Sequence, residues 1–450
     1  MANQPYNVVI IGSGPAGMFA ALELARVKPG LRIAVLEKGP LRSVDEKANL
    51  TCGWGGSGAF SDGKLNHTAI SGGQLRDFLA QDEFEEIMRY VDKLYLEFGG
   101  DPKLVDATTE EVKDLRRQAI AADLELIHFP IRHLGTDKSR IIVESIRKYL
   151  EKNGVDVAVT SGVERINPGV GIFEIVCEDG KSLLTQRVVV APGRGGAEWF
   201  QHEARRLGLA VENNGVDIGV RVEVRDEIMK PVTDLVYELK TLYFSDTYKD
   251  KVRTFCMCPS GFVAIENYRG LTTVNGHSAK DIKSRNTNFA ILVTKVFTEP
   301  FNDPLEYARS VSGLANLLAG GGVLVQRLGD LKDHRRSTVK KIRESFVAPT
   351  LPEAVPGDIS LALPHRHLVS IIEMLEALNK IVPGIASDST LLYGIEVKFY
   401  SNRVKVKHAG FETPIEGLYV AGDGSGYTRG LMQSSMHGVI VARHIARALG

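Results

Sequence analysis

Residues 7–17 read NVVIIGSGPAG, an apolar run that leads into a turn with three glycines. A helical pattern follows over residues 18–25, and a second apolar run, residues 33–36, ends on Glu37. This order of strand, glycine turn, helix, strand and acidic residue is typical of a dinucleotide-binding unit. A glycine-rich turn in some other α/β protein would leave the acidic residue at the end of the second strand unexplained.

Each glycine of the turn has a separate physical reason. Gly12 permits the tight turn out of the strand, Gly14 has no side chain to block a pyrophosphate, and Gly17 lets the helix pack closely on the sheet. The helix N-terminus offers unpaired N–H groups and a partial positive charge to phosphates. Glu37 is placed to accept hydrogen bonds from ribose hydroxyls.

Length and composition narrow the class of protein. The chain has 450 residues, enough for two or three domains, and 55 Lys and Arg residues offset 55 Asp and Glu residues. A formal net charge of zero gives no reason to expect a nucleic-acid partner. No apolar run approaches a membrane span, no signal peptide precedes the first strand, and four cysteines do not suggest a disulfide scaffold. We therefore expect a cytoplasmic protein with reduced thiols.

Similar motifs near both ends of the chain indicate one domain that is interrupted by the middle of the sequence. The last seventy residues return to the glycine-rich strand ends seen at the start. The expected segments are a first cofactor-binding part at residues 1–72, a helical insertion at 73–135, a second cofactor-binding part at 136–215, a mixed α/β substrate or cap domain at 216–380, and a third cofactor-binding part at 381–450.

Residues 417–424 read GLYVAGDG, a strand that ends in Gly-Asp. Together with residues 7–17, this stretch resembles flavoproteins of the glutathione-reductase-like fold class. The resemblance implies an α/β protein with a Rossmann-like FAD-binding domain, in which Asp423 lies near the ribityl chain or pyrophosphate of FAD. It also implies that the following helix points its N-terminus at the flavin, which suits negative charge on a reduced ring.

Three further motifs are more specific. Residues 52–65 read CGWGGSGAFSDGKL, residues 217–223 read DIGVRVE, and residues 254–261 read TFCMCPSG. They resemble motifs of a poorly characterised family of FAD-dependent dehydrogenases, except that Ser260 stands where a glycine is expected. The resemblance covers most of the chain. It implies FAD and a redox fold, but it names no substrate.

The loop of residues 52–64 holds many glycines, which favours backbone packed against a flat ligand or a phosphate. The alternative is a flexible surface loop, against which Trp54 and Phe60 argue. The residues predicted to bind FAD are Gly12, Gly14, Pro15, Ala16, Gly17, Glu37, Lys38, Gly55, Gly56, Ser57, Ser61, Asp62, Gly63, Val163, Ala191, Pro192, Gly193, Gly422, Asp423, Gly430 and Leu431.

The catalytic candidates are weaker. Tyr427 and Arg429 stand in the turn before the last helix, and His437 stands on that helix, where it could move a proton or simply pack. Cys256 and Cys258 form a Cys-x-Cys pair that is either catalytic or a pair of buried small hydrophobes. No second pair of ligands accompanies them, so we expect no metal site.

The sequence has no second glycine fingerprint between a strand and a helix, so NAD(P)H is expected to bind transiently as an electron donor or not at all. The predicted function is hydride transfer between flavin N5 and a small or medium organic substrate, by an FAD-dependent dehydrogenase or reductase. Three alternatives stay open: a flavin monooxygenase, a redox-neutral flavin isomerase, and a non-catalytic FAD-binding partner of another protein. A protein electron donor or acceptor is possible, and the oligomeric state is unknown.

Overall fold

The computed structural model describes residues 4–41, 52–60, 63–105, 109–236, 238–268, 270–278, 282–301, 303–398 and 400–450. The chain forms two compact units, which are described one at a time. Unit 1 comprises residues 1–106, 129–214 and 401–450, and unit 2 comprises residues 107–128 and 215–400.

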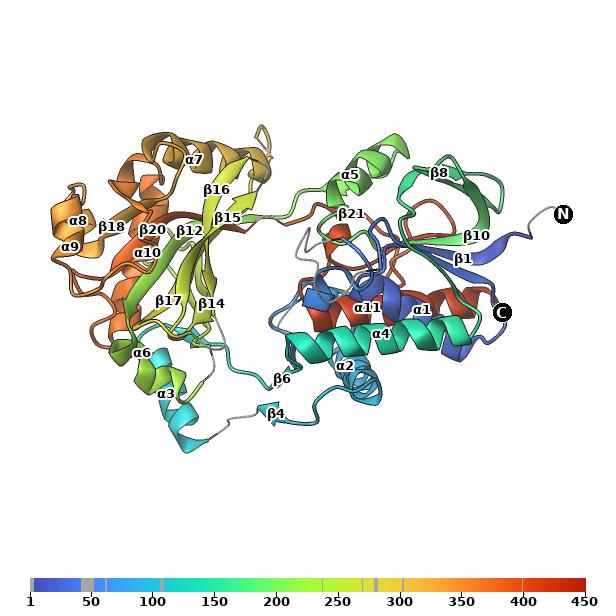
Figure 1. The fold of residues 1–450 in the computed structure, drawn as a ribbon, viewed down its shortest axis with the longest axis horizontal. Coiled ribbons are helices and arrows are strands. Elements are labelled where there is room, and N and C mark those ends of the chain that lie inside the picture. The colour runs from blue at the N-terminus through green and yellow to red at the C-terminus, as the bar shows by residue number, and fades with distance from the viewer. Residues whose placement is uncertain are drawn as a thin grey trace. The chain divides into compact units, whose positions relative to one another are not determined.

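Unit 1 holds the glycine fingerprint and the carboxyl-terminal helix (Figure 1). Its elements are β1 (Tyr6–Ile11), α1 (Pro15–Val27), β2 (Ile33–Leu36), η1 (Gly56–Phe60), β3 (Lys64–Asn66), η2 (Leu75–Asp77), α2 (Gln81–Glu97), β4 (Leu104–Val105), β6 (Ile131–His133), α4 (Thr136–Lys152), β7 (Asp156–Ala158), β8 (Val163–Pro168), β9 (Phe173–Cys177), β10 (Ser182–Val190), α5 (Ala197–Arg206), β11 (Val211–Glu212), β21 (Arg403–Val404), β22 (Leu418–Val420), η4 (Asp423–Ser425) and α11 (Leu431–Ala448).

The central sheet of unit 1 is parallel, in the order β7-β2-β1-β10-β22. The amino-terminal half of β10 turns away from this layer and pairs antiparallel with β9, which pairs with β8. Strand β1 is buried on both faces from Val8 to Ile11, as the unbroken apolar run predicts for a central parallel strand. The predicted Rossmann-like α/β fold is confirmed.

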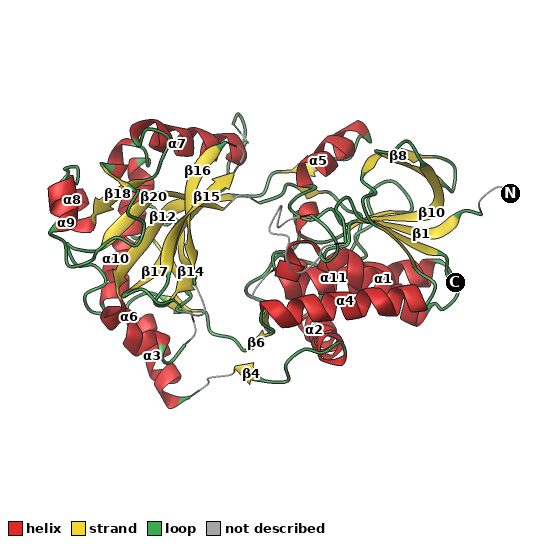
Figure 2. Cartoon of the chain, in the orientation of Figure 1, coloured by secondary structure: helices red, strands yellow, loops and turns green. Residues whose placement is uncertain are grey.

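Helices α1, α4 and α11 form one layer beside this sheet (Figure 2). Helices α1 and α11 pack closely against each other. The close approach is possible because Gly438 on α11 lies directly against the backbone of Ala16. The α1 sequence is apolar on nearly all sides, and Met18 to Leu24 are buried without exception. Such a helix needs covering on more than one face, and α11 and the sheet provide it.

Unit 2 is built on an antiparallel sheet. Its elements are α3 (Glu110–Ala121), β5 (Glu125–Leu126), β12 (Val216–Arg225), α6 (Asp226–Thr233), β13 (Thr241–Phe244), β14 (Lys251–Cys258), β15 (Phe262–Tyr268), β16 (Leu271–His277), β17 (Asn286–Lys295), α7 (Pro304–Leu318), β18 (Leu324–Arg327), α8 (Leu328–Lys332), α9 (Val339–Arg343), β19 (Val355–Pro356), η3 (Ile359–Leu361), α10 (His365–Asn379) and β20 (Leu391–Lys398).

The eight strands of this sheet run in the order β19-β18-β20-β12-β17-β14-β13-β5. Every pair is antiparallel except β18 with β19. The even-numbered β12 residues from Ile218 to Val224 join an apolar core with α3, α6 and α10. The hairpin of β15 and β16 contacts strands of this sheet.

The helical insertion expected at residues 73–135 is divided between the units. Helix α2 belongs to unit 1, whereas α3 and β5 belong to unit 2, where β5 pairs with β13. The expected start of unit 2 at residue 216 lies one residue from the observed start of its main segment, and its expected end at residue 380 falls before β20, the neighbour of β12 in the sheet.

In the part of the chain that the structure describes, no helix is both long enough and apolar enough to cross a membrane.

Candidate functional site

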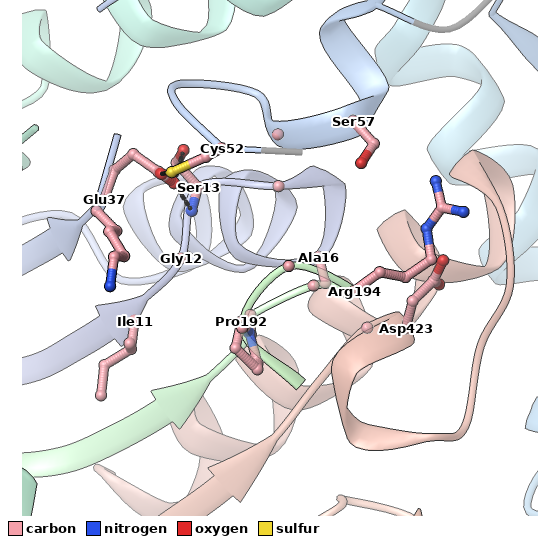
Figure 3. Close-up of a pocket in the computed structure, with 18 of the residues that line it drawn as sticks. Ile11, Gly12, Ser13, Ala16, Glu37, Cys52, Ser57, Pro192, Arg194 and Asp423 are labelled. Carbon is pink, nitrogen blue, oxygen red and sulfur yellow. Dashed lines mark hydrogen bonds between the residues drawn. The ribbon is translucent and has the colours of Figure 1, made fainter. Parts of the chain in front are cut away.

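A cavity of about 350 Å³ opens where the parallel strands of unit 1 end. It follows Ile11 of β1, Leu36 of β2, Val190 of β10 and Val420 of β22, which is where ligands bind in open α/β sheets. Figure 3 shows the residues around it. The lining comes from all three chain segments of the unit, so the cavity exists only after the unit has folded.

Two helices begin at this cavity without a capping side chain. Gly14 precedes α1 and Gly430 precedes α11, and neither helix has a side-chain hydrogen bond at its N-cap. Both glycines line the cavity. The free N–H groups and partial positive charge of a helix N-terminus bind anionic groups such as a pyrophosphate.

The glycines of the fingerprint divide their tasks as the sequence predicts. A Cβ atom on Gly12, whose φ is +100°, would lie 2.2 Å from the carbonyl oxygen of Ala191. A Cβ atom on Gly17 would lie 1.9 Å from the carbonyl oxygen of Gly12. A Cβ atom on Gly14 would meet nothing within 4 Å, so it would enter the space of the cavity. The cradle therefore fits a ligand that approaches the backbone closely.

Glu37 lines the cavity and also carries structural hydrogen bonds. Its Oε2 atom accepts hydrogen bonds from the backbone N–H (3.1 Å) and the hydroxyl (2.6 Å) of Ser13. Its Oε1 atom accepts from the backbone N–H groups of Gly39 (2.8 Å) and Gly53 (2.9 Å). These four donors bind both oxygens of the carboxylate, so Glu37 has a structural role whatever it does toward a ligand. Glu37 thereby ties three loops together at the cavity, and its role toward a ribose stays a prediction.

We expect Glu37→Gln to lower the free energy of unfolding of the FAD-free protein by about 1–3 kcal/mol, because a Gln amide cannot accept from four donors. Thermal unfolding before and after FAD removal measures this effect. Glu178→Gln is the matched control, since Glu178 lines the same cavity but forms a largely exposed ion pair with Lys38. Lost FAD affinity with unchanged FAD-free stability would instead support the ribose-binding role.

Asp423 lies at the turn after β22 and faces the cavity. Its Oδ1 atom accepts from the hydroxyls of Ser434 (2.6 Å) and Thr428 (2.9 Å), and its Oδ2 atom accepts a 3.4 Å bond from the Gly430 N–H. Burial raises the pKa of the Asp423 carboxyl, although these donors and the nearby Arg194 guanidinium favour its charged form. Oδ2 is the more weakly bound oxygen and is the atom available to a ligand hydroxyl.

Several lining residues escaped the sequence prediction. Arg194 extends beside Asp423 (Figure 3) and is a cation in the cavity lining. Trp199 on α5 and Ser434 on α11 also line the cavity. Arg194 lies in the glycine-rich segment after β10, where the sequence prediction of FAD binding used only the neighbouring small residues. Ser13 escaped because its role depends on Glu37, on another loop.

Most of the residues predicted to bind FAD are brought together. Those that line the cavity are Gly12, Gly14, Pro15, Ala16, Glu37, Lys38, Gly56, Ser57, Val163, Ala191, Pro192, Gly193, Gly422, Asp423, Gly430 and Leu431. Three others lie outside the lining: Gly17 packs α1 on the turn of Gly12, and Gly55 and Gly63 pack against α4 or the segment before it. Ser61 and Asp62 lie outside the described residues.

His437 is completely buried and does not line the cavity. Its Nδ1 atom accepts a 3.0 Å hydrogen bond from the Gly422 N–H, and its ring packs 4.0 Å from that of Phe411. Burial lowers the pKa of His437 to about 3, so the imidazole stays neutral. This geometry favours the packing alternative, in which His437 holds the Gly422 turn in place.

Tyr427 and Arg429 are also outside the cavity lining. The Tyr427 hydroxyl donates a 2.6 Å hydrogen bond to the carbonyl oxygen of Val404, and burial raises the pKa of Tyr427 to about 12. The Arg429 N–H donates to the Gly72 carbonyl at 2.6 Å. Cys256 and Cys258 belong to unit 2 and do not contribute to this cavity. The structure therefore gathers the predicted cofactor residues but not the five catalytic candidates.

His437→Asn is expected to reduce the acid sensitivity of unit 1. The unfolded chain binds a proton at this histidine near its ordinary pKa of 6.5, whereas the folded chain resists protonation down to about 3. Stability is therefore lost as the pH falls below 6.5, by about 1.4 kcal/mol per pH unit. Thermal unfolding between pH 4 and pH 7, followed by release of FAD fluorescence, measures the slope.

The control for this substitution is His367→Asn. Burial also lowers the pKa of His367, to about 4, but this residue lies in unit 2. Its substitution should leave the acid slope of FAD release unchanged. An unchanged slope in His437→Asn would contradict the assigned burial of this histidine.

Comparison with known proteins agrees with the geometry of the cavity. Residues 7–226 match the family model of the FAD binding domain, and residues 216–399 match the model described as FAD-dependent protein, C-terminal domain-like. An uncharacterised protein of Clostridium beijerinckii is 28% identical, and the alignment covers 97% of this chain and 80% of that protein.

Two solved structures are similar at low identity. Glycine oxidase from Geobacillus kaustophilus is 15% identical, with a TM-score of 0.39 and coverage of 98% of this chain and 95% of that one. NikD, an unusual amino acid oxidase of nikkomycin biosynthesis, is 12% identical, with a TM-score of 0.41 and coverage of 100% and 95%. These scores are too low to carry an argument about this chain.

The glycine cradle, the two uncapped helices and both family matches agree on the cofactor, which is FAD. The chain thus carries a match to an FAD binding domain at residues 7–226 and a match to an FAD-dependent protein C-terminal domain at residues 216–399.

Proposed function

We propose that this protein is an FAD-dependent dehydrogenase or reductase that transfers a hydride between flavin N5 and a carbon atom of a small or medium organic molecule. The observation that carries the proposal is the cavity of unit 1, where the uncapped N-termini of α1 and α11 meet the ends of four parallel strands. When bound, FAD supplies a ring that accepts or donates a hydride.

The residues of the cavity have separate parts in this function. The N-terminus of α1 binds the pyrophosphate through its free N–H groups, because Gly14 leaves the backbone open to the ligand. Asp423 accepts hydrogen bonds from ligand hydroxyls. The N-terminus of α11 favours negative charge near Gly430, and so favours a reduced, anionic cofactor.

The architecture of unit 2 supports a source of electrons other than a resident nicotinamide cofactor. Its main sheet is antiparallel apart from one edge pair, whereas a second dinucleotide site of the Rossmann type requires consecutive parallel strands. Within the described residues, consecutive parallel strands of this kind form the central sheet of unit 1. In a dehydrogenase of this kind the substrate itself would reduce the flavin, and in a reductase NAD(P)H would bind transiently as the electron donor.

The test is an anaerobic visible spectrum of the FAD-loaded protein, recorded before and after addition of NADH, NADPH or candidate substrates. Reduction by an organic substrate, without oxygen and without a nucleotide, would support the dehydrogenase. Rapid reduction by one nucleotide, followed by reoxidation with an organic acceptor, would support the reductase. The variant Gly14→Ala, which is expected to hold little FAD, controls for reactions in solution.

Other outcomes would overturn the proposal. Oxidation of NADH or NADPH that depends on oxygen and yields an oxygenated organic product would identify a monooxygenase. Turnover by reduced flavin with no net acceptor would identify an isomerase. A flavin that stays inert to every small molecule but exchanges electrons with, or binds stably to, a second protein would exclude direct action on an organic substrate.

A further inference from the structure

A buried polar layer lies on one face of the main sheet in unit 2. Along β12 the even residues enter the apolar core, and the odd residues Asp217, Arg221 and Glu223 lie on the opposite face. All three are at most 2% exposed. Arg221 is among the largest fully buried side chains of the described residues. A buried guanidinium requires partners for its charge and its five N–H groups.

The contacts of Arg221 lead to the Cys-x-Cys motif. Its Nε atom donates to Asn288 Oδ1 (2.8 Å), and its Nη2 atom donates to the carbonyl oxygen of Cys256 (2.6 Å) and to the Sγ atom of Cys258 (3.4 Å). A Cβ atom on Gly276 would overlap this same Nη2 atom. Strand β16 therefore needs a glycine at position 276 to leave room for the Arg221 guanidinium.

Arg221 shares its buried carboxylate partner with a second cation. Arg221 Nη1 lies 3.5 Å from Glu396 Oε1, and the mostly buried Lys398 Nζ lies 3.1 Å from the same oxygen. Among the described residues, Glu396 is the buried carboxylate that forms an ion pair with Arg221, and it serves two cations. Glu266, which also approaches Lys398, is about half exposed. The guanidinium of Arg221, 3.4 Å from the Cys258 sulfur, would stabilise a thiolate at Cys258.

Cys256 is the more exposed of the two cysteines. The β14 ladder with β17 shifts register between Phe255 and Cys258, and Cys256 has a φ of +47° in this bulge. Cys256 is partly exposed, whereas Cys258 is buried. A hydrogen bond to Cys258, together with burial, raises the pKa of the Cys256 thiol well above its ordinary value. The two cysteine side chains therefore interact directly, and Arg221 lies on the Cys258 side of the pair.

We propose that Cys256 and Cys258 form a redox-active dithiol that hydroperoxides oxidise to a disulfide, with Arg221 as the residue that holds Cys258 as a thiolate. The Cys258 thiolate attacks one peroxide oxygen, the O–O bond breaks, and hydroxide leaves as a sulfenic acid forms on Cys258. The Cys256 sulfur then attacks the Cys258 sulfur, the S–O bond breaks, and water leaves. Overall, the Cys258 thiolate and the Cys256 thiol lose two electrons and one proton, and hydrogen peroxide becomes one water molecule and one hydroxide ion.

Cys177 shows what a structural cysteine looks like in the same chain. It is buried in the apolar core of unit 1 on β9, and burial raises the pKa of its thiol. No Arg or Lys side chain contacts its sulfur in the hydrogen bonds and ion pairs of the described residues. It is the internal reference for the experiment, because it is comparably buried without a guanidinium beside it.

The experiment treats the full-length, FAD-loaded protein with a small excess of hydrogen peroxide and then alkylates the remaining thiols. Mass spectrometry of unreduced peptides measures each cysteine. The peptide with Cys256 and Cys258 should lose two hydrogen atoms at least about tenfold faster than Cys177 becomes oxidised. Cys256→Ser should stop at a sulfenic acid on Cys258 that dimedone traps, and Cys177→Ser should behave as wild type.

Arg221→Met should slow oxidation of Cys258 at least about tenfold, whereas Arg221→Lys should keep part of the rate because it keeps the charge. The two cysteine variants keep the test decisive if Arg221→Met fails to fold. Equal oxidation rates for Cys258 and Cys177 would overturn the proposal. So would direct conversion of either cysteine in the pair to sulfinic acid without a disulfide.

Discussion

Gly438→Ala is expected to lower the free energy of unfolding of unit 1 by about 3 kcal/mol. The added Cβ atom would lie 2.1 Å from the carbonyl oxygen of Ala16 and 2.9 Å from the backbone nitrogen of Ala20. Both atoms are backbone atoms of α1, so no side chain can move aside. The two helices must separate, and the separation shifts the helix N-termini that line the cavity. Chemical denaturation measures the stability, and fluorescence titration measures the affinity for FAD.

The matched control is Gly313→Ala, the same substitution within helix α7 of unit 2. A Cβ atom there would meet nothing within 4 Å, and the backbone is helical. This variant should be unchanged or more stable by up to about 1 kcal/mol. Wild-type stability and FAD affinity in Gly438→Ala would show that α1 and α11 are not packed as closely as described.

Gly14→Ala is expected to weaken FAD binding by about 3 kcal/mol, or roughly a hundredfold, and to leave the fold intact. The φ of Gly14 is −65°, which alanine adopts freely, and its Cβ atom would meet no protein atom within 4 Å. The methyl group would instead occupy the space that the pyrophosphate needs beside the first turn of α1. Titration of the FAD-free protein with FAD measures the loss.

Gly17→Ala separates this effect from a general disturbance of the turn. Its Cβ atom would lie 1.9 Å from a backbone oxygen, so it should lower both the stability of the FAD-free protein and the affinity for FAD. Gly14→Ala should lower the affinity alone. If Gly14→Ala binds FAD as tightly as wild type, the ligand does not approach the backbone at this position.

The local parts of the site could be predicted because each depends on neighbours in the chain. An apolar run that ends in Gly12 predicts a buried strand followed by a tight turn. Gly17 predicts that the helix after this turn packs closely on the sheet. The Gly-Asp pair that ends at Asp423 predicts a second strand end of the same kind. The Rossmann-like α/β fold and the FAD cofactor follow from these patterns, and both predictions are confirmed.

The tasks of individual polar side chains could not be predicted in the same way. Glu37 follows a strand as a ribose-binding acid would, but the sequence does not show that its carboxylate also accepts hydrogen bonds from Ser13 and from the loop at Gly53. His437 stands on the expected helix, but the side of the helix it occupies is covered by Phe411. Burial of each group depends on segments that meet only in the folded chain.

The glycine-lined dinucleotide cradle can be predicted from the sequence, because strand, turn and helix patterns repeat over a few residues and glycine conformations are local. The membership of helix α3 in the second unit and the position of Arg221 beside Cys258 emerge only in the folded chain. Such contacts depend on strand pairing between distant segments, whose register sets which polar groups are buried together. The charge that a buried guanidinium needs is a property of that assembled layer, not of any one stretch of sequence.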